Sequence, residues 1–378
     1  MNQSGQTVCL CMIVKNEHHV LRRCLESVRP LIDQWVIVDT GSTDGTQQLV
    51  RDFFHGLPGE LAERPWKNFG HNRSEAITLA RPRADYLLIL DADEFLAPPP
   101  GFQWPRLLHD AYNFVMDSGG VTYSRMQLVR TALPWRFEGV LHEYLTCDGN
   151  YTQATMPGIK TIRMLEGARS RDPLTYRKDA AILEEALQHE PANARYMFYL
   201  AQSYRDAGEA TLAIDRYQKR ATMGGFAEET WCSLYEAAKL MQATGVSWPV
   251  VLDTFLAAFA FRPHRAEPLY RVGLAYQQHK QYALARLFLA QAMQIPFPTE
   301  DLLFVEADVY NFLLPLEYAV ASYWLGMHDE AIRVTDTLLN NQTLSSERRD
   351  HLLRNRQFSI DALRAIGRTY KPHGITIV

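Results

Sequence analysis

Two acidic residues close an apolar run in the first quarter of the chain. The run Tyr-Leu-Leu-Ile-Leu ends in Asp91-Ala92-Asp93. Residues two apart on an extended strand point to the same side, so a strand over residues 86–94 directs both carboxylates into one volume. Mg²⁺ and Mn²⁺ prefer oxygen ligands and also bind diphosphates. Because two anions at the end of a buried run need a compensating cation, we predict that Asp91 and Asp93 bind a metal.

Two further polar stretches follow apolar runs nearer the N-terminus. Residues 39–46 read Asp-Thr-Gly-Ser-Thr-Asp-Gly-Thr, and residues 15–17 read Lys-Asn-Glu. The glycines allow a tight turn and a close approach of a ligand to the backbone. Asp39 is placed to accept a hydrogen bond from the N–H of a nucleoside base. Asp44 is better suited to cap the helix that follows it.

The elements that must position these residues alternate between strand and helix patterns. Apolar runs at 7–14, 35–40 and 86–94 are typical of strands buried on both faces. Helical patterns cover 20–28, 46–54 and 74–80. This alternation with short links predicts a parallel α/β sheet, whose ligands bind beyond the carboxyl ends of the strands. All three polar stretches are therefore expected at one edge of the sheet.

From about residue 170 the pattern changes to helix after helix. Segments 193–225 and 264–296, and a third from about 316, each show two helices with small residues at their crossing, and 226–263 is a looser copy. A period of roughly 34 residues is typical of tetratricopeptide-type repeats, which stack into a solenoid with a concave surface. A plain helical bundle is the alternative. We expect two domains, 1–170 and 171–378.

Composition excludes several classes of partner. The chain has 378 residues, 47% hydrophobic and 22% charged, with a net charge of -4. These values are typical of a globular protein and give no basic footprint for nucleic acid. No apolar stretch reaches membrane-spanning length and no secretion signal opens the chain, so we expect a cytoplasmic location. The five cysteines, among them Cys9 and Cys11 in the first apolar run, are expected to be small buried hydrophobes.

Three motifs together resemble family 2 glycosyltransferases of the GT-A fold: MIVKNE (12–17), VIVDTGSTDGT (36–46) and LLILDADE (87–94). NFGHNRSEAITLA (68–80) is similar to the helix that carries the family's nucleotide-contacting arginine. The resemblance spans about residues 7–165. Together with the helical tail it resembles a bacterial subgroup in which one chain joins catalysis to acceptor recognition. It implies a GT-A domain with a mostly parallel sheet, followed by an all-α tetratricopeptide-like solenoid.

The resemblance also implies roles for particular residues. Glu17 and Asp39 bind the nucleoside, and Arg73 lies beside the base. Asp91 and Asp93 form the acidic pair that binds the metal, Mn²⁺ or Mg²⁺, and with it the diphosphate. An inverting mechanism further requires a carboxylate base that deprotonates the acceptor as it attacks the anomeric carbon.

A His-Glu pair within EGVLHEYL (138–145) supplies the candidate base. Similar proteins show such a pair, which implies Glu143 as the base and His142 as a third metal ligand or a contact to the diphosphate. The chain departs from many family members because no Glu-Asp pair follows Asp91-Ala92-Asp93. Glu138 and Glu94 therefore stay open as alternative bases.

Basic residues are concentrated between the two predicted domains. Arginine forks suit diphosphate oxygens, and a leaving diphosphate needs neutralising charge. Arg169 and Arg171 are our choice for this contact, while a solvated linker is the alternative interpretation.

The resulting hypothesis is a metal-dependent inverting hexosyltransferase that uses a nucleotide-sugar. We expect a uridine diphosphate (UDP) sugar, although guanosine also offers an N–H to Asp39. The solenoid would hold a protein or peptide acceptor. One alternative acceptor is lipopolysaccharide core or another glycan. The other alternative is a repeat adaptor without catalysis, against which the intact Asp91, Asp93 and Glu143 argue.

Overall fold

The computed structural model describes residues 5–118, 121–164, 166–167, 172–301 and 303–370. Its contacts divide the chain into two compact units, Met1–Ala213 and Ile214–Val378. The first unit contains, besides a sheet, the helices α4 (Thr175–His189) and α5 (Ala194–Asp206). The predicted domain boundary between residues 170 and 171 lies outside the described residues.

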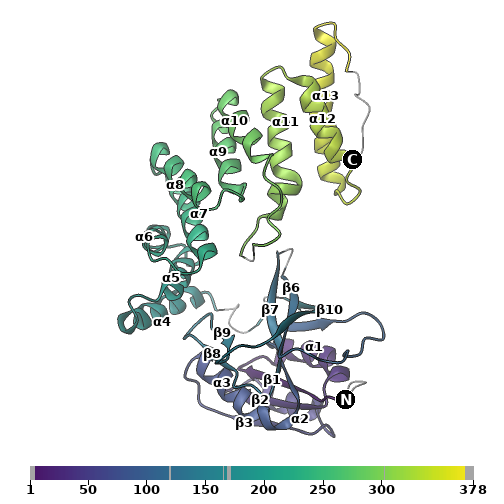
Figure 1. Ribbon diagram of the computed structural model, residues 1–378, viewed down its shortest axis with the longest axis vertical. Helices are drawn as coiled ribbons and strands as arrows, with labels where there is room; N and C mark the ends of the chain where they lie inside the picture. Colours follow the sequence, from purple (N-terminus) through teal and green to yellow (C-terminus); the bar gives the residue numbers. More distant parts are fainter. Residues whose placement is uncertain (1–4, 119–120, 165, 168–171, 302, 371–378) are drawn as a thin grey trace. The chain divides into compact units, whose positions relative to one another are not determined.

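Among its described residues, the first unit is built on an eight-stranded mixed sheet of order β3-β2-β1-β4-β7-β6-β10-β5. Figure 1 labels β1, β2, β3, β6, β7 and β10 of this sheet. The first four strands in this order are parallel: β3 (Gly59–Glu63), β2 (Gln34–Asp39), β1 (Val8–Val14) and β4 (Tyr86–Ile89). The other four are β7 (Val121–Arg130), β6 (Ala111–Ser118), β10 (Gln153–Arg163) and β5 (Glu94–Ala97). In this half β10 runs parallel to β6, whereas β7 runs antiparallel to both β4 and β6, and β5 runs antiparallel to β10. The predicted mostly parallel sheet is therefore confirmed, with its antiparallel pairs confined to this half.

Three helices cover the parallel half of the sheet. They are α1 (His18–Val28), α2 (Thr46–Phe53) and α3 (Phe69–Ala80), and short 3-10 turns follow at Arg29–Leu31 and Arg81–Arg83. Residues at alternate positions of each strand pack on opposite faces, because successive strand side chains point in opposite directions. α1 and α2 therefore cover one face and α3 covers the other.

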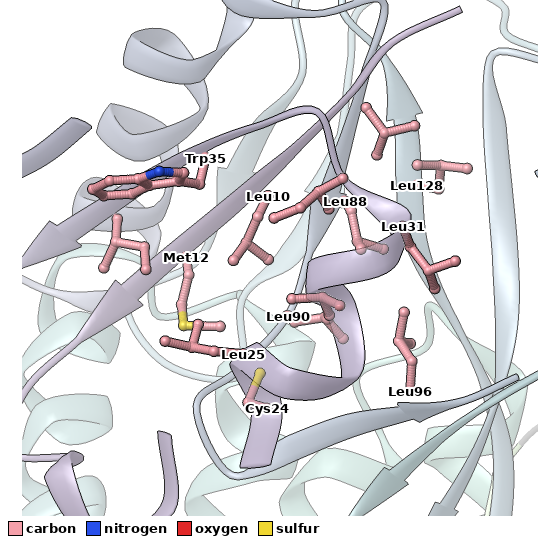
Figure 2. Packing of buried hydrophobic residues seen from close by; sticks show 14 of the residues in the cluster. Leu10, Met12, Cys24, Leu25, Leu31, Trp35, Leu88, Leu90, Leu96 and Leu128 are labelled. Carbon is pink, nitrogen blue, oxygen red and sulfur yellow. The ribbon is translucent and has the colours of Figure 1, made fainter. Parts of the chain in front are cut away.

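The core on the α1 face shows this packing directly. Figure 2 shows Leu10, Met12 and Leu88 from the strands against Cys24 and Leu25 from α1. On the opposite face, Cys9 and Cys11 pack with side chains of α3, as their alternation predicts. All five cysteines are buried, as predicted, and have free thiols. Burial on both faces holds the strand ends in place at the edge where the polar stretches emerge.

The strand predicted over residues 86–94 is wrong in its second half. β4 ends at Ile89, and the chain then turns, with the Glu94 amide donating to the Asp91 carbonyl at 3.1 Å. Glu94 begins β5, which pairs with β10 instead of continuing along β1. The carboxylates of Asp91 and Asp93 therefore project from a turn, and their direction is not set by strand alternation.

A separate two-stranded ribbon of β8 (Arg136–Glu138) and β9 (Tyr144–Thr146) follows β7. Its connection, residues 139–143, contains the predicted His-Glu pair. The ribbon's first strand contacts α3 through Ser74, whose hydroxyl accepts a hydrogen bond from the Phe137 amide at 2.9 Å. This contact ties the connection to the helix that carries Arg73.

The second unit consists of helical hairpins, as the repeat pattern predicts. α6 (Ala210–Ala221) includes the boundary between the units. The helices that follow are α7 (Ala227–Ala243), α8 (Trp248–Phe261), α9 (Glu267–Gln278), α10 (Tyr282–Ala292), α11 (Leu314–Trp324, preceded by a π-turn at Val309–Leu313), α12 (His328–Leu339) and α13 (Ser346–Ala365). Small residues permit the close crossings: a Cβ at Gly273 of α9 would lie 2.5 Å from the Leu289 side chain of α10. Of the helices described, none combines the length and apolar character needed to cross a membrane.

Candidate active site

The loops that follow β1 and β2 are hydrogen-bonded to each other. The Asn16 amide donates to the Ser42 hydroxyl at 2.9 Å, and the Glu17 amide donates to the Thr46 hydroxyl at 3.0 Å. In return, the Asn16 side chain accepts from the Thr43 amide at 2.8 Å. Asn16 has a positive φ of 58°, a conformation that asparagine tolerates better than most residues. The two strand-end motifs thus form one ordered surface.

Asp44 lies one residue before Gly45, the N-cap of α2, and binds the first amide of the helix with its side chain. Its carboxylate accepts from the Thr46 amide at 3.1 Å and from the His18 amide at 3.1 Å, at the starts of α2 and α1. Burial alone would raise the pKa of Asp44, but the hydrogen bonds from Thr46 and His18 lower it below its ordinary value. Asp44 therefore stabilises two helix N-termini.

Asp39, at the end of β2, is fully buried. Its Oδ1 accepts hydrogen bonds from the Gly41 amide at 2.9 Å, the Ser42 amide at 2.8 Å and the Gln47 side chain at 3.0 Å. Its Oδ2 is also buried and has no hydrogen-bond partner among the described residues. A buried acceptor left in this state costs roughly 1–3 kcal/mol. This oxygen is consequently available to a donor group from a ligand.

Asp91 lies between two arginines from different elements. Arg73 of α3 donates to its Oδ1, and Arg125 of β7 lies 3.4 Å from its Oδ2. Burial of the Asp91 carboxyl would raise its pKa, but Arg73 and then Arg125 hold that pKa well below its usual range. Asp91 is therefore ionised at any physiological pH.

Asp93 is much less strongly paired. Its side chain is 12% exposed, and Arg163 Nε lies 3.8 Å from its Oδ2. Burial, followed by the charge of neighbouring Asp91, raises the pKa of Asp93. Gly167 lies against the same carboxylate, since a Cβ there would be 3.5 Å from Oδ2. A cation beside Asp93 would relieve both the desolvation and the repulsion from Asp91.

Glu94 lies beneath the acidic pair and is fully buried. Its Oε2 accepts from the Asp91 amide at 3.1 Å and from the Arg125 guanidinium. Burial raises the pKa of Glu94, while Arg125 acts in the opposite direction. Arg125 thus contacts both Asp91 and Glu94, and the Glu94 carboxylate stabilises the turn that carries Asp91.

Glu143 reaches the same group of side chains from the ribbon. Its Oε1 lies 2.6 Å from Arg73 Nε, and the side chain is 9% exposed. Arg73 therefore bridges Glu143 and Asp91, with its guanidinium above the Phe137 ring. Burial would lower the pKa of Arg73, but Asp91 and Glu143 raise it. The predicted base and the acidic pair are brought together in the folded chain.

Residues 9–115 of the chain match the family model described as glycosyl transferase family 2. This region is a family 2 glycosyltransferase domain. The match contains Asp39, Arg73, Asp91 and Asp93, whereas Glu143 lies beyond it.

Two relatives are similar to parts of the chain. A TPR repeat-containing protein of Synechococcus elongatus is 34% identical over 145 residues, which are 36% of this chain and 34% of the relative. The SPbeta prophage-derived glycosyltransferase SunS of Bacillus subtilis is 22% identical over 230 residues, 56% of this chain and 53% of the relative. The chain thus spans about a third and about half of the length of these two relatives.

A solved structure, MamA, is similar to part of the chain at 17% identity with a TM-score of 0.36, covering 48% of this chain and 92% of MamA.

The sequence also predicts that Glu17, Arg73, Arg169 and Arg171 bind the nucleotide-sugar. Glu17 is the N-cap residue of α1, where its carbonyl accepts from the Leu21 amide at 2.9 Å. The resemblance implies that Arg73 lies beside the nucleoside base, but in the folded chain Arg73 contacts Asp91 and Glu143. Arg169 and Arg171 lie outside the described residues, so their predicted contact to the diphosphate stays a prediction.

The structure does not bring His142 together with Asp91 and Asp93. The His142 ring is exposed and stacks on Tyr199 of α5, with ring centroids 4.0 Å apart and an interplanar angle of 8°. Within the described part of the chain, no group of three His, Cys, Asp or Glu side chains could hold a metal ion. His142 therefore does not join Asp91 and Asp93 as the third ligand that the sequence predicts.

The alternative bases are separated by their surroundings. Glu138 is near the surface, where it accepts from the Tyr144 hydroxyl at 2.8 Å and from Arg136 at 2.6 Å, and these bonds lower its pKa. Glu94 is fully buried under the Asp91 turn. Glu143 is connected to Asp91 through Arg73 and keeps a side chain that is 9% exposed, whereas Glu94 has no exposed surface.

Sequence reasoning missed Arg125. No motif surrounds it, because it lies within an ordinary strand pattern. β4 and β7 pair with Leu88 opposite Leu128, and continuing that antiparallel register beyond Ile89 brings Arg125 opposite Asp91. The contact between Arg125 and Asp91 can be predicted only when the pairing of β4 with β7 is known.

Proposed function

We propose that the chain is a metal-dependent inverting glycosyltransferase that transfers a sugar from a UDP-sugar to a protein or peptide. The family 2 match supports nucleotide-sugar transfer in general. The buried Oδ2 of Asp39, which lacks a partner among the described residues, carries the proposal for the donor. It stands at the sheet edge where β1 and β2 end, as expected for the ligand of an open α/β sheet.

The nucleoside would complete the hydrogen bonding of Asp39. An N–H from a pyrimidine or purine ring donates to Oδ2, while Oδ1 stays bound to the backbone of the loop. This arrangement holds the carboxylate fixed before the ligand arrives. Uracil offers one N–H in its ring plane, and we take uridine as the base for that reason; guanine is the competing choice.

The acidic pair would hold Mn²⁺ or Mg²⁺. Asp93 fits this role because it is largely buried and is repelled by Asp91. Its contact with the Arg163 guanidinium is long, at 3.8 Å, and leaves the carboxylate weakly neutralised. Asp91 fits less freely, since Arg73 and Arg125 already contact both of its oxygens. When bound, the metal ion supplies positive charge that neutralises the donor diphosphate.

Glu143 would act as the base. The acceptor O–H or S–H transfers its proton to the Glu143 carboxylate, and the acceptor atom forms a bond to the anomeric carbon of the sugar. The bond between that carbon and the diphosphate oxygen breaks, and UDP leaves with the bonding electrons. Arg73 and Arg125 lie beside the acidic pair, where their charges offset the negative charge of the departing diphosphate.

A protein or peptide acceptor is proposed because the second unit is a row of helical hairpins. Such repeats expose a continuous concave face that suits an extended chain. The similarity to a TPR repeat-containing protein is consistent with this architecture. Transfer to lipopolysaccharide core in preference to peptides would contradict this part of the proposal and leave the donor chemistry intact.

A thermal-shift comparison of Asp39→Asn with the wild type tests the donor assignment. We expect UDP and UDP-sugars with Mn²⁺ to stabilise the wild type, by about 2.7 kcal/mol at a ligand concentration of 100 Kd. The amide introduced at this position presents a second donor to the uracil N–H, so the variant should lose most of this shift. Asp44→Asn, in the neighbouring loop, serves as the matched control and should keep it. An equal shift in Asp39→Asn and the wild type would contradict the assignment.

A further inference from the structure

The loop that carries Glu143 has an unusual backbone. Gly139 has a φ of 110° and His142 has a φ of 50°, so two residues of this short segment occupy the left-handed region. Glycine adopts such angles readily, but histidine does not. A non-glycine residue persists there only where the surrounding structure holds it. The contacts that hold His142 therefore also determine the direction of Glu143, its neighbour.

One side of the loop packs against α3. A Cβ added at Gly70 would lie 2.4 Å from the Gly139 carbonyl oxygen, so only glycine fits at this crossing. Arg73 follows one helical turn later and contacts Glu143 at 2.6 Å. The α3 side thus sets how close Glu143 lies to the acidic pair.

The other side of the loop packs against α4 and α5. Leu141 is buried in a cluster with Leu183 of α4 and with Tyr196 and Leu200 of α5. All of these residues belong to the first compact unit. α4 and α5, which begin the helical half of the sequence, thus pack against the loop that carries the candidate base.

Two side chains of α5 hold the residues on either side of Glu143. Arg195 Nη2 donates to the His142 carbonyl at 2.9 Å, and the guanidinium lies 5.0 Å from the Tyr144 ring centroid. Tyr199 stacks on the His142 ring, and Arg195 also lies 4.9 Å from the Tyr199 centroid. Cation–π and stacking contacts of this kind fix the ring planes as well as the backbone.

We propose that Arg195 and Tyr199 are positioning residues for Glu143. They hold His142 in its left-handed conformation and fix Tyr144, so that the Glu143 carboxylate meets Arg73. This proposal rests on the assignment of Glu143 as the base. It also gives the His142 ring a structural role, because a ring stacked on Tyr199 cannot turn to a metal without losing that contact.

Amide hydrogen exchange on the full-length chain tests the positioning without any ligand. Arg195→Ala and Tyr199→Ala should each speed exchange in residues 139–146 by about 10-fold or more, because the loop opens more often. Residues 36–46 should exchange as in the wild type, which also shows that the domain is folded. Arg205→Ala, near the far end of α5, is the matched control and should leave residues 139–146 unchanged. Unchanged exchange of this loop in both α5 variants would overturn the proposal.

Turnover distinguishes positioning from a general structural effect. The assay follows UDP release from UDP-glucose, UDP-galactose and UDP-N-acetylglucosamine with Mn²⁺. Arg195→Ala should lower kcat roughly 10- to 100-fold, as expected for a misplaced catalytic group, with little change in donor KM. Arg195→Lys keeps the charge and one donor, so it should recover part of the loss.

A double-mutant comparison separates the two levels of the proposal. If Arg195 acts through Glu143, Arg195→Ala should cause no further loss in a Glu143→Gln background. An equal loss in both backgrounds would contradict the positioning role. If Glu143→Gln itself retains wild-type turnover, or no donor is turned over, the proposed function fails, whereas faster exchange of the loop would still support the positioning.

Discussion

The two halves of the candidate site are held together in different ways. Around Asp39 the bonds are local: its Oδ1 is bound by the amides of Gly41 and Ser42, which follow it in the chain. Around Asp91 they are distant, since its partners are Arg73 from α3 and Arg125 from β7. The first half is organised by neutral amides, and the second is organised by opposite charges.

This difference separates what each half can do. A carboxylate held by fixed amides keeps its position and leaves one oxygen for a ligand, which suits recognition of the donor. In a group of acids and arginines, the ion pairs rearrange when a charged ligand binds. This suits a site where a diphosphate arrives and leaves. Changes in the first half should therefore alter donor affinity, while changes in the second should alter turnover and stability.

The largest expected effect is a loss of turnover when a residue in the half of the site around Asp91 is changed. Glu143→Gln removes the proposed base while keeping the shape of the side chain, so we expect kcat to fall by about 10²- to 10⁴-fold. The affinity for UDP, measured by calorimetry, should stay within about twofold of the wild type, because Asp39 is unchanged. An equal fall in UDP affinity would place Glu143 in donor binding.

The next effect is on stability. Arg125→Met leaves fully buried Glu94 without its cation, and removing one partner of a buried ion pair costs about 3–5 kcal/mol. The exposed pair of Arg136 and Glu138 provides the matched control, and Arg136→Met should cost much less than Arg125→Met, because solvent screens an exposed pair. Urea unfolding measures both variants. Equal losses would show that burial of Glu94 does not make the difference.

A smaller effect tests the contact between α3 and the loop that carries Glu143. Replacing glycine by alanine within a helix normally stabilises it, but the Cβ in Gly70→Ala would meet the Gly139 carbonyl at 2.4 Å. We expect a net loss of about 1–3 kcal/mol and a lower kcat. Thr78→Ala, at an exposed position of the same helix, should cause no such loss. A stabilised Gly70→Ala variant would contradict the close crossing.

The smallest effect concerns Asp44 and depends on pH. Its folded-state pKa is lowered from 3.8 by hydrogen bonds, so its carboxylate stabilises the fold above that pH, and the contribution is lost as the pH falls below it. Asp44→Asn leaves only one accepting oxygen for the amides of His18 and Thr46, and the loss of one hydrogen bond should cost about 1 kcal/mol at pH 7. The cost should shrink as the pH falls below 3.8, where the wild-type side chain becomes neutral as well. Urea unfolding at several pH values checks this, and a cost independent of pH would contradict it.

The first half of the site could be predicted from sequence because its contacts are local. Asp39 and the loop to Thr46 lie at the end of a buried apolar run, and burial on both faces predicts β2 and its neighbours. The paired helices were predictable for a similar reason, since each hairpin is one continuous segment with its own periodicity. In both cases the pattern and the contact involve the same stretch of chain.

The second half could not be predicted because its contacts depend on how distant elements pair. Arg125 meets Asp91 only through the register of β7 on β4, and the turn at 91–94 exists because Glu94 joins β10. The stacking of His142 on Tyr199 depends on where α5 packs. A histidine beside a candidate base suggested a metal ligand, but nothing local could reveal the ring that it contacts.

Release of UDP from a UDP-sugar, measured with Mn²⁺ and again with excess chelator, tests the central claim most directly. The same assay is run on Asp93→Ala, which alters the carboxylate best suited to the metal. We predict release that requires Mn²⁺, is lost in chelator and is lost in Asp93→Ala. Equal release in chelator, or an Asp93→Ala variant as active as the wild type, would contradict the claim that this acidic pair serves a metal-dependent transfer.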